Sequence, residues 1–184
     1  PATVAEALEG ADIVITMLPA GRHVLSVWKE ALPLLDSDTL LIDCSTIDVD
    51  SARAAHEMAA GAGLLSLDAP VSGGVGGASA GTLTFMTGGS AEAFEAASPV
   101  LGRMGAKIVY CGAAGAGQAA KICNNMILAA TMVATCEGFV LAERLAAIAP
   151  DGLDHVFYAN SGSEANDTAI KMVWYVNTVL GRPQ

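Results

Sequence analysis

Apolar positions along the chain fall into short blocks separated by longer segments with helical composition. Blocks dominated by Val, Ile and Leu, at residues 11–19, 38–46 and 63–70, are typical of strands buried on both faces of a sheet. Two further blocks, at 81–89 and 106–112, are rich in β-branched and aromatic residues and also predict strands.

The segments between these blocks predict helices. Residues 21–35 form one that breaks near Pro33, and the Ala-rich residues 49–63 form another that stops at a glycine pair. Residues 90–105 form a third, with Ser90 as its N-terminal cap. Because strands alternate with helices, we expect βαβ units: the fold class is α/β, with a mostly parallel sheet and flanking helices.

A glycine-rich turn follows the last strand block. Gly115-x-Gly117-x-x-Ala120 has the spacing of a dinucleotide-binding fingerprint. That fingerprint requires a second strand within a unit of about 30 residues, ending near an acidic side chain. Here the chain stays helical in composition from about Ala116 to Ala147, and Glu137 falls inside that long helix. We therefore expect that this turn does not bind a pyrophosphate.

The same turn leads to a conspicuous lysine. Lys121 is the only charged residue between Ile108 and Cys136. Asn124 and Asn125 follow at i+3 and i+4, so all three side chains share one helical face and can converge on a small ligand. Its ammonium could exchange a proton with a substrate hydroxyl. The alternative is a surface lysine that keeps its charge in water, with asparagines as ordinary polar positions.

A second candidate site follows the block at 63–70. Ser72, Gly73, Gly74, Gly76 and Gly77 leave backbone N–H groups uncovered by side chains. Such a loop can bind a carboxylate or a phosphate. The alternative is a flexible connection whose glycines occupy turn positions.

Composition narrows the possible partners. The net charge of −10 and the pI near 4.5 argue against nucleic acid, which is held by Lys and Arg. Hydrophobic residues make up 53% of the chain and charged residues only 15%, which predicts more buried surface than the chain itself provides. We expect a small-molecule or protein partner.

Cysteine spacing favours a cytoplasmic protein. Cys44, Cys111, Cys123 and Cys136 show neither metal-ligand nor disulfide spacing, so we expect no metal and reduced thiols in the core. No signal peptide is visible after Pro1. The most apolar stretch, residues 122–136, is shorter than the roughly 20 residues a bilayer requires, so no membrane is expected.

Four segments carry a resemblance to a known family. "DIVITMLP", "IDCSTI", "DAPVSGGVGGASAGTLTFMTGG" and "GAAGAGQAAKICNN" occur in the order and spacing of the 3-hydroxyisobutyrate dehydrogenase family, the β-hydroxyacid dehydrogenases that include tartronate semialdehyde reductases. The resemblance covers roughly residues 1–145. It implies an NAD(P)-dependent oxidoreductase with a Rossmann-like domain that oxidises a small β-hydroxyacid.

The resemblance also implies roles for single residues. Lys121 would be the catalytic acid/base at the alcohol, and Asn125 would orient the substrate beside Asn124. Ser72, Gly73 and Gly74 would hold the substrate carboxylate. Leu18, Pro19 and Thr46 would line the nicotinamide side of NAD or NADP.

The sequence departs from the family at both ends. Family members place a strand and a true Gly-x-Gly-x-x-Gly turn some 60 residues before the point matching Pro1, so we expect an incomplete, N-terminally truncated Rossmann-like sheet and an impaired cofactor site. The residues after about 150 resemble instead a class III (ω-amino acid:pyruvate) aminotransferase, in which a strand ends in Ser-Gly-Ser-Glu-Ala and a helix follows. In that family Gly162 and Ser163 would help hold a pyridoxal phosphate (PLP).

Three segments are expected from these resemblances: a truncated NAD(P)-binding domain at 1–113, a long helix at 114–148 that opens the family's helical domain, and an aminotransferase-like strand-helix segment at 149–184. PLP binding is not expected, because the lysine that would form its Schiff base lies beyond this segment in aminotransferases. The alternatives to the dehydrogenase are an aminotransferase fragment and a non-catalytic chimeric product joined near residues 140–150. The long helix would expose apolar surface and favour self-association.

Overall fold

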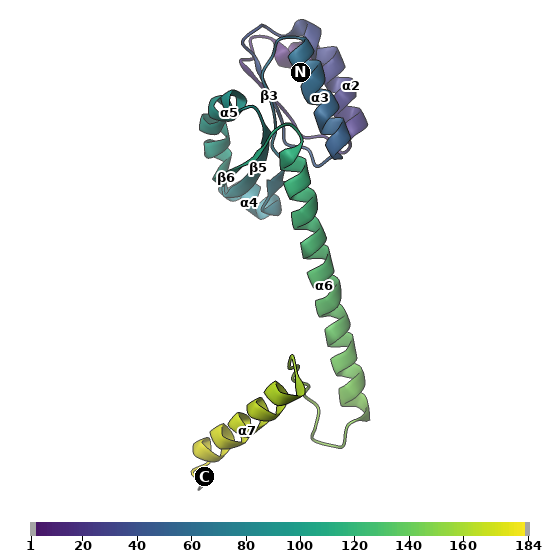
Figure 1. Ribbon diagram of the computed structural model, residues 1–184, viewed down its shortest axis with the longest axis vertical. Coiled ribbons are helices and arrows are strands. Elements are labelled where there is room, and N and C mark those ends of the chain that lie inside the picture. Colours follow the sequence, from purple (N-terminus) through teal and green to yellow (C-terminus); the bar gives the residue numbers. More distant parts are fainter. Residues whose placement is uncertain (1–2, 183–184) are drawn as a thin grey trace. The chain divides into compact units, whose positions relative to one another are not determined.

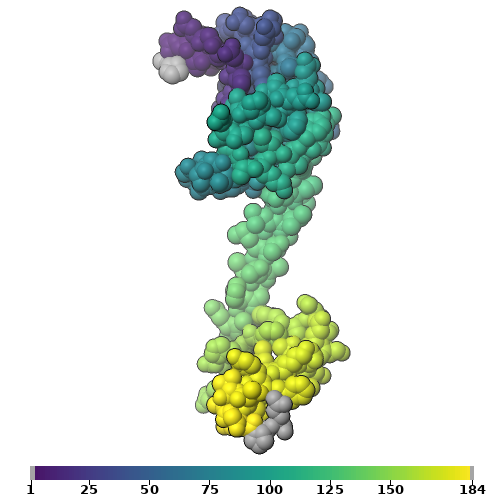
Figure 2. Space-filling view, turned by 90° about the vertical axis from the view of Figure 1, so that its left-hand side faces the viewer, coloured from purple at the N-terminus to yellow at the C-terminus, as the bar shows by residue number. Residues whose placement is uncertain are grey.

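A computed structural model describes residues 3–182 of the chain. It divides into two compact units, 1–129 and 130–184, and the space-filling view shows the purple-to-teal part of the first unit as a closely packed body (Figure 2). The segment boundaries expected at 113 and 148 stay predictions.

The first unit is a sheet with helices on both faces (Figure 1). Its strands are β1 (Ile13–Thr16), β2 (Leu40–Asp43), β3 (Ser66–Asp68), β4 (Val71–Ser72), β5 (Leu83–Gly89) and β6 (Gly105–Gly112). Its helices are α1 (Val4–Leu8), α2 (Gly21–Ala31), η1 (Leu32–Leu34), α3 (Val49–Gly61), α4 (Gly74–Ala80) and α5 (Ala91–Met104).

The sheet has the order β1-β2-β3-β5-β4, and β6 pairs with β5. The pairs β1/β2, β2/β3 and β5/β6 are parallel, whereas β5 runs antiparallel to β3 and β4. Register places Asp43 beside Asp68, so their side chains lie on the same face at the carboxyl ends of β2 and β3. The predicted α/β class with a mostly parallel sheet is confirmed.

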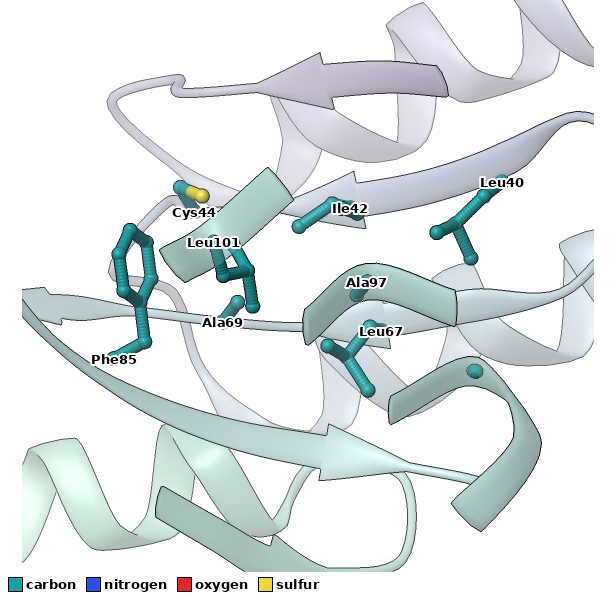
Figure 3. Close-up of a cluster of buried hydrophobic side chains, with 9 residues drawn as sticks. Leu40, Ile42, Cys44, Leu67, Ala69, Phe85, Ala97 and Leu101 are labelled. Atoms are coloured by element: carbon teal, nitrogen blue, oxygen red, sulfur yellow. The ribbon is translucent and has the colours of Figure 1, made fainter. Parts of the chain in front are cut away.

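Alternation along β2 separates two cores. Leu40, Ile42 and Cys44 pack with Leu67 under α5, where Figure 3 shows Ala97 and Leu101 over the sheet. Leu41 points to the opposite face and packs with α2 and α3; the buried members of that core are Val24, Trp28, Leu41, Ile47, Ala52, Ala55, Ala59 and Leu64. Both faces of the parallel strands are thus covered, which explains their continuous apolar composition.

Helix boundaries follow the predicted signals. The Ser90 side chain accepts a hydrogen bond from the Ala93 N–H at 3.1 Å, so it caps α5 as expected. α2 ends at Ala31, and the chain continues as the short helix η1, which contains Pro33. A proline lacks the N–H that an α-helix requires, which explains the predicted break.

The glycine-rich segment is more ordered than expected. We predicted an open loop at residues 72–77, but the structure forms the strand β4 and the helix α4 there. Gly73 and Gly74 have φ of 135° and 60°, which redirect the chain from strand to helix. The Gly77 N–H donates to the Gly73 carbonyl, so part of this backbone is already paired.

The long helix is confirmed as α6 (Ala116–Ile148). Its buried residues are Gly117, Gln118 and Lys121, all in the first two turns. By length and composition alone it could cross a membrane, contrary to the expectation drawn from residues 122–136. Core helices of soluble proteins meet the same criterion, so the helix is weak support for a membrane span.

The second unit contains the rest of α6 and α7 (Gly162–Val179). The strand expected before Ser161 is absent: residues 153–159 have no regular structure, because no neighbouring strand pairs with them. The Ser161 side chain accepts from the Glu164 N–H at 3.2 Å and so caps α7. α7 buries no residue.

Candidate active site

A cavity of about 860 Å³ lies at the carboxyl ends of β1 and β2, between the start of α4 and the first turns of α6. This position is the usual ligand site of an open α/β sheet. Its lining is mostly apolar: Ile15, Met17, Cys44, Thr46, Val71, Ser72, Gly73, Gly74, Val75, Ala78, Leu83, Phe85, Met104, Lys121, Asn125 and Leu128.

Lys121 supplies the only charge in this lining. Its side chain is 9% exposed, and within residues 3–182 no hydrogen bond or ion pair to its ammonium is formed. An enclosed cation without a partner favours an anionic or hydroxylic ligand. The alternative of an ordinary surface lysine is wrong, because α6 packs this turn against the sheet.

The two asparagines separate. Asn125 lines the cavity one turn beyond Lys121. Asn124 does not line it, and its side-chain amide donates to the Asn125 Oδ1 at 3.3 Å. The expected convergence of all three side chains on one ligand therefore holds for Lys121 and Asn125 only.

The predicted anion-binding segment reaches the same cavity. Ser72, Gly73 and Gly74 line it, while Gly76 and Gly77 lie within α4 and outside the lining. At the positive φ of Gly73 and Gly74 an L side chain would be strained, so glycine is required there. The cavity lining thus combines the Ser72 hydroxyl and the backbone of Gly73 and Gly74 with the Lys121 ammonium.

Only one of the three residues predicted for the nicotinamide side lines the cavity. Thr46 lines the cavity, whereas Leu18 and Pro19 lie in the connection from β1 to α2 and do not. Leu18 packs against the core under α2 and α3, and its N–H donates to the Ser45 Oγ at 2.8 Å. Sequence reasoning missed Ser45, which fixes this connection to the end of β2.

Asp43 is the buried acceptor behind that connection. Its Oδ1 accepts from the hydroxyls of Ser45 at 2.6 Å and Thr16 at 2.7 Å, while Oδ2 is buried without a partner among the described residues. Burial raises the pKa of the Asp43 carboxyl above its usual value, and the hydrogen bonds from Ser45 and Thr16 oppose that rise. Burial and Asp43 likewise raise the pKa of the Cys44 thiol to about 12, so this cavity cysteine is not a nucleophile.

Asp68 was not predicted as a functional residue, although its contacts define the start of α6. Its Oδ1 accepts from the Gly115 N–H at 2.8 Å, and its Oδ2 accepts from the Gln118 N–H at 3.0 Å. The free N–H groups with which this turn could bind a phosphate are thus occupied by a side chain. This arrangement explains why the fingerprint spelling is a false match.

Close packing explains the glycines of the same turn. A Cβ at Gly117 would contact the Met86 carbonyl oxygen and lie 2.7 Å from the Asp68 Oδ2. A Cβ at Gly88, which pairs with Asp68 on β5, would lie 2.6 Å from the Asp68 Oδ1. Gly117 and Lys121 are four residues apart and therefore lie on the same face of α6. This face contacts the sheet at Gly117 and lines the cavity at Lys121.

Gln118 joins α6 to the end of β2. Its Nε2 donates to the Ser45 carbonyl at 2.7 Å and its Oε1 accepts from the Ile47 N–H at 3.1 Å. These bonds bracket Thr46, which lines the cavity. The i+3 relation to Lys121 makes Gln118 a link between the lysine-bearing helix and the strand ends.

The remaining predicted residues are outside this cavity. Gly162 and Ser163 begin α7 in the second unit, and both are exposed. Of the cysteines, Cys44 is buried and Cys111 is partly buried, but Cys123 and Cys136 lie on exposed parts of α6 and not in the core. Within residues 3–182 no cluster of three potential metal ligands occurs.

Two family models match the chain. Residues 1–112 match the NAD binding domain of 6-phosphogluconate dehydrogenase, and residues 115–174 match the NAD-binding domain of NADP-dependent 3-hydroxyisobutyrate dehydrogenase. The second match crosses the junction expected near 140–150, so it gives no support to an aminotransferase-like segment.

Individual proteins agree with these models. The chain is 51% identical over 157 residues to 3-hydroxyisobutyrate dehydrogenase of Pseudomonas aeruginosa, covering 84% of this chain and 52% of the relative. It is 50% identical over 139 residues to the NAD-dependent L-serine dehydrogenase of that organism, covering 74% and 47%. The chain spans about half the length of the curated relatives it matches.

A solved structure shares the fold. Mycobacterium tuberculosis 3-hydroxyisobutyrate dehydrogenase, described with L-serine, superposes with a TM-score of 0.77 at 48% identity. The alignment covers 91% of this chain and 53% of that one. The Rossmann-like arrangement of strands, flanking helices and long helix is therefore shared with this relative.

Proposed function

Because the chain belongs to the 3-hydroxyisobutyrate dehydrogenase family, we propose that its cavity serves the oxidation of a small β-hydroxyacid with NAD or NADP. The observation that carries the proposal is the enclosed ammonium of Lys121, which has no ion-pair partner among residues 3–182 and lies in the same cavity as Ser72–Gly74 and Asn125. A hydroxyacid offers a carboxylate and a hydroxyl, and this lining complements both groups.

Each cavity residue has a role in this proposal. In its unprotonated form, the Lys121 amine accepts the hydroxyl proton as the alcohol is oxidised, and the ammonium that results stabilises the negative charge on that oxygen. Ser72 and the backbone at Gly73 and Gly74 hold the carboxylate, while Asn125 orients the hydroxyl-bearing carbon. Asn124, which lies outside the cavity, supports Asn125 through its side-chain hydrogen bond.

The residues present fit the nicotinamide end of the cofactor. Met17, 64% exposed, and Ile15 present apolar surface at the end of β1, beside Thr46 at the end of β2. A planar, weakly polar ring suits such a wall at the carboxyl ends of parallel strands. Leu18 and Pro19 would shape this wall through the connection that Ser45 holds. Bound there, NAD or NADP supplies the acceptor for the hydride.

The relatives favour a small substrate. Two are described as a dehydrogenase of 3-hydroxyisobutyrate and a dehydrogenase of L-serine, both small acids with a hydroxyl on the β carbon. We propose this substrate class and no nucleic-acid partner, in line with the net charge of −10. Four free thiols support a reducing, cytoplasmic location.

For residues 150–184 we retain the aminotransferase-like origin as a proposal. Its support is the Ser161 cap and the lack of any buried residue in α7. PLP binding at Gly162 and Ser163 is not part of it, because a capped and fully exposed helix start offers no enclosed phosphate site. If two coding sequences were joined, the source DNA should show an interrupted reading frame near codons 140–150. A continuous reading frame there would contradict the proposed junction.

Turnover tests the main proposal. The purified chain should form reduced nicotinamide from NAD or NADP with 3-hydroxyisobutyrate or L-serine. Lys121→Ala should lower kcat/KM by roughly 10²- to 10⁴-fold, the usual contribution of a general acid or base. Cys123→Ala, at an exposed position on the same helix outside the cavity, is the matched control and should change kcat/KM far less. Equal losses in both variants would contradict the role of Lys121.

A further inference from the structure

We propose that Asp68 is a positioning residue that fixes the first turn of α6 on the sheet and so holds Lys121 in the cavity; this inference rests on the proposed function. Asp68 is 1% exposed and ends β3, whereas the turn it contacts begins 47 residues later in the chain. Its carboxylate is therefore a cap supplied by the sheet, and the helix takes its position from it.

The two carboxylate oxygens of Asp68 accept hydrogen bonds from different N–H groups. Oδ1 receives the Gly115 N–H before the helix and Oδ2 receives the Gln118 N–H within its first turn. A carboxylate at a helix start is stabilised by the helix dipole as well as by these hydrogen bonds. Because two contacts at the start of the helix restrain both the axial position and the rotation of α6, Lys121 is directed to one side.

A second layer holds Asp68 itself. With His56 protonated on Nε2, that nitrogen donates to the Asp68 Oδ1 at 2.9 Å, and the Ser66 hydroxyl donates to the His56 Nδ1 at 2.7 Å. The chain of contacts runs from Ser66 on β3 through His56 on α3 to the start of α6. It fixes the carboxylate in the orientation that both helix N–H groups require.

These three residue types also occur in hydrolytic sites, but the geometry here excludes that use. Ser66 is buried and donates its own hydrogen to His56, and none of the three residues lines the cavity. Asp68 is already occupied by the helix start. The network acts on Lys121 through α6 and not on a substrate.

The space around Asp68 allows little adjustment. Gly88 and Gly117 approach it so closely that a Cβ at either position would lie 2.6–2.7 Å from its carboxylate oxygens. Asp68→Asn retains the volume but replaces one acceptor with an NH₂ group, which faces an N–H donor. The loss of one hydrogen bond and the new donor–donor contact should loosen the first turn of α6.

Lysine labelling measures this effect without requiring turnover. Lys121 competes for a limiting amine reagent with the exposed Lys29, Lys107 and Lys171, and mass spectrometry gives its relative rate in each protein. Lys121 should be the slowest of the four in the native chain. Asp68→Asn should accelerate it by roughly tenfold, because local opening of the helix start governs its access.

The matched control is Ser90→Ala, which removes the N-terminal cap of α5; this end of the helix does not line the cavity, which α5 reaches only through Met104 at its other end. It should leave the relative labelling of Lys121 within about twofold of the native value, because the loss of one cap opens its own helix end. If Asp68→Asn does not fold, His56→Ala should accelerate Lys121 by a smaller factor, and His56→Gln, which keeps a donor toward Asp68, should restore slow labelling.

Two results would overturn the proposal: unchanged Lys121 labelling in Asp68→Asn, or equal acceleration in Ser90→Ala. Where the chain turns over hydroxyacid, Asp68→Asn should also lower kcat more than Ser90→Ala does. Accelerated labelling in a chain without turnover would support the role of Asp68 and contradict the proposed oxidation, so the two failures are distinguishable.

Discussion

At the scale of single residues, the site depends on two carboxyls that lie side by side but bind different partners. Asp43 and Asp68 are paired in register at the ends of β2 and β3. Asp68 receives N–H groups of α6 on both oxygens, whereas Asp43 has one oxygen without a partner among residues 3–182. Of the two, Asp68 is the carboxyl that receives the N–H groups at a helix start.

Asp43 should make the stability of the chain depend on pH. Because burial raises the pKa of this carboxyl in the folded protein, the folded chain keeps the proton to a higher pH than the unfolded chain does. The contribution of Asp43 is therefore favourable in acid and is lost as the pH rises from the ordinary value of 3.8 through the raised pKa. Urea unfolding should show Asp43→Asn gaining stability relative to the native chain over this window; a constant difference between them would contradict the raised pKa.

At the scale of elements, α6 is fixed to the sheet through its first two turns. Gly117, Gln118 and Lys121 are its only buried residues, and the first two lie against the ends of β2, β3 and β5. Because this attachment fixes the rotation of α6 about its own axis, it also fixes the direction in which the Lys121 side chain points. Glycine at 117 is required for approach to the sheet.

A pair of glycines in α6 tests this attachment. Gly117→Ala places a methyl group against the Met86 carbonyl and the Asp68 carboxylate and should lower the free energy of unfolding by about 1–3 kcal/mol, as overpacking does. Gly138→Ala, in the same helix with open space at its Cβ, should raise it by up to about 1 kcal/mol. Chemical denaturation of both variants measures the contrast. Similar effects at both positions would show that the first turn is not packed closely.

Much of this fold could be predicted because its signals are local. The strand blocks, the break near Pro33, the Ser90 cap and the extent of α6 follow from apolar period, capping and backbone chemistry. The helix α4 was missed because glycine disfavours helices. Cys123 and Cys136 were wrongly expected in the core, because an apolar sequence does not specify what covers a helix.

The residues of the candidate site also divide into those that the sequence predicts and those that only the fold brings together. Lys121, Asn125 and Ser72–Gly74 were predictable, since an isolated lysine and adjacent glycines stand out in an apolar sequence. Asp68 was missed as a cap because its partners Gly115 and Gln118 are far along the chain, and only the sheet brings them together. Ser45 was missed for the same reason, since its contacts come from β1 and α6.

At the scale of the whole molecule, the long helix α6 contributes many exposed apolar side chains among the described residues. Large exposed hydrophobic side chains on α6 include Met126, Ile127, Met132, Val133 and Phe139. Exposed apolar surface of this extent is typical of an interface. We propose that the chain self-associates through α6.

Sedimentation tests this proposal. The chain should show a mass that rises with concentration, and Met132→Glu with Val133→Glu should shift it toward the monomer. Each apolar side chain buried in an interface contributes about 1–3 kcal/mol, so the double variant should weaken association strongly. The control is Leu34→Glu, which changes an equally exposed apolar residue in η1. A monomer at all concentrations, or equal weakening by the control, would contradict an α6 interface.

The central claim is that the Lys121 amino group accepts the substrate proton, and amine rescue tests it most directly. Lys121→Ala leaves space in the cavity for a small amine, so added methylamine should restore hydroxyacid-dependent formation of reduced nicotinamide in proportion to its concentration. Asn125→Ala, which retains the lysine, should not respond. A Lys121→Ala variant that turns over at the native rate, or one that is inactive and gains nothing from the amine, would contradict the account.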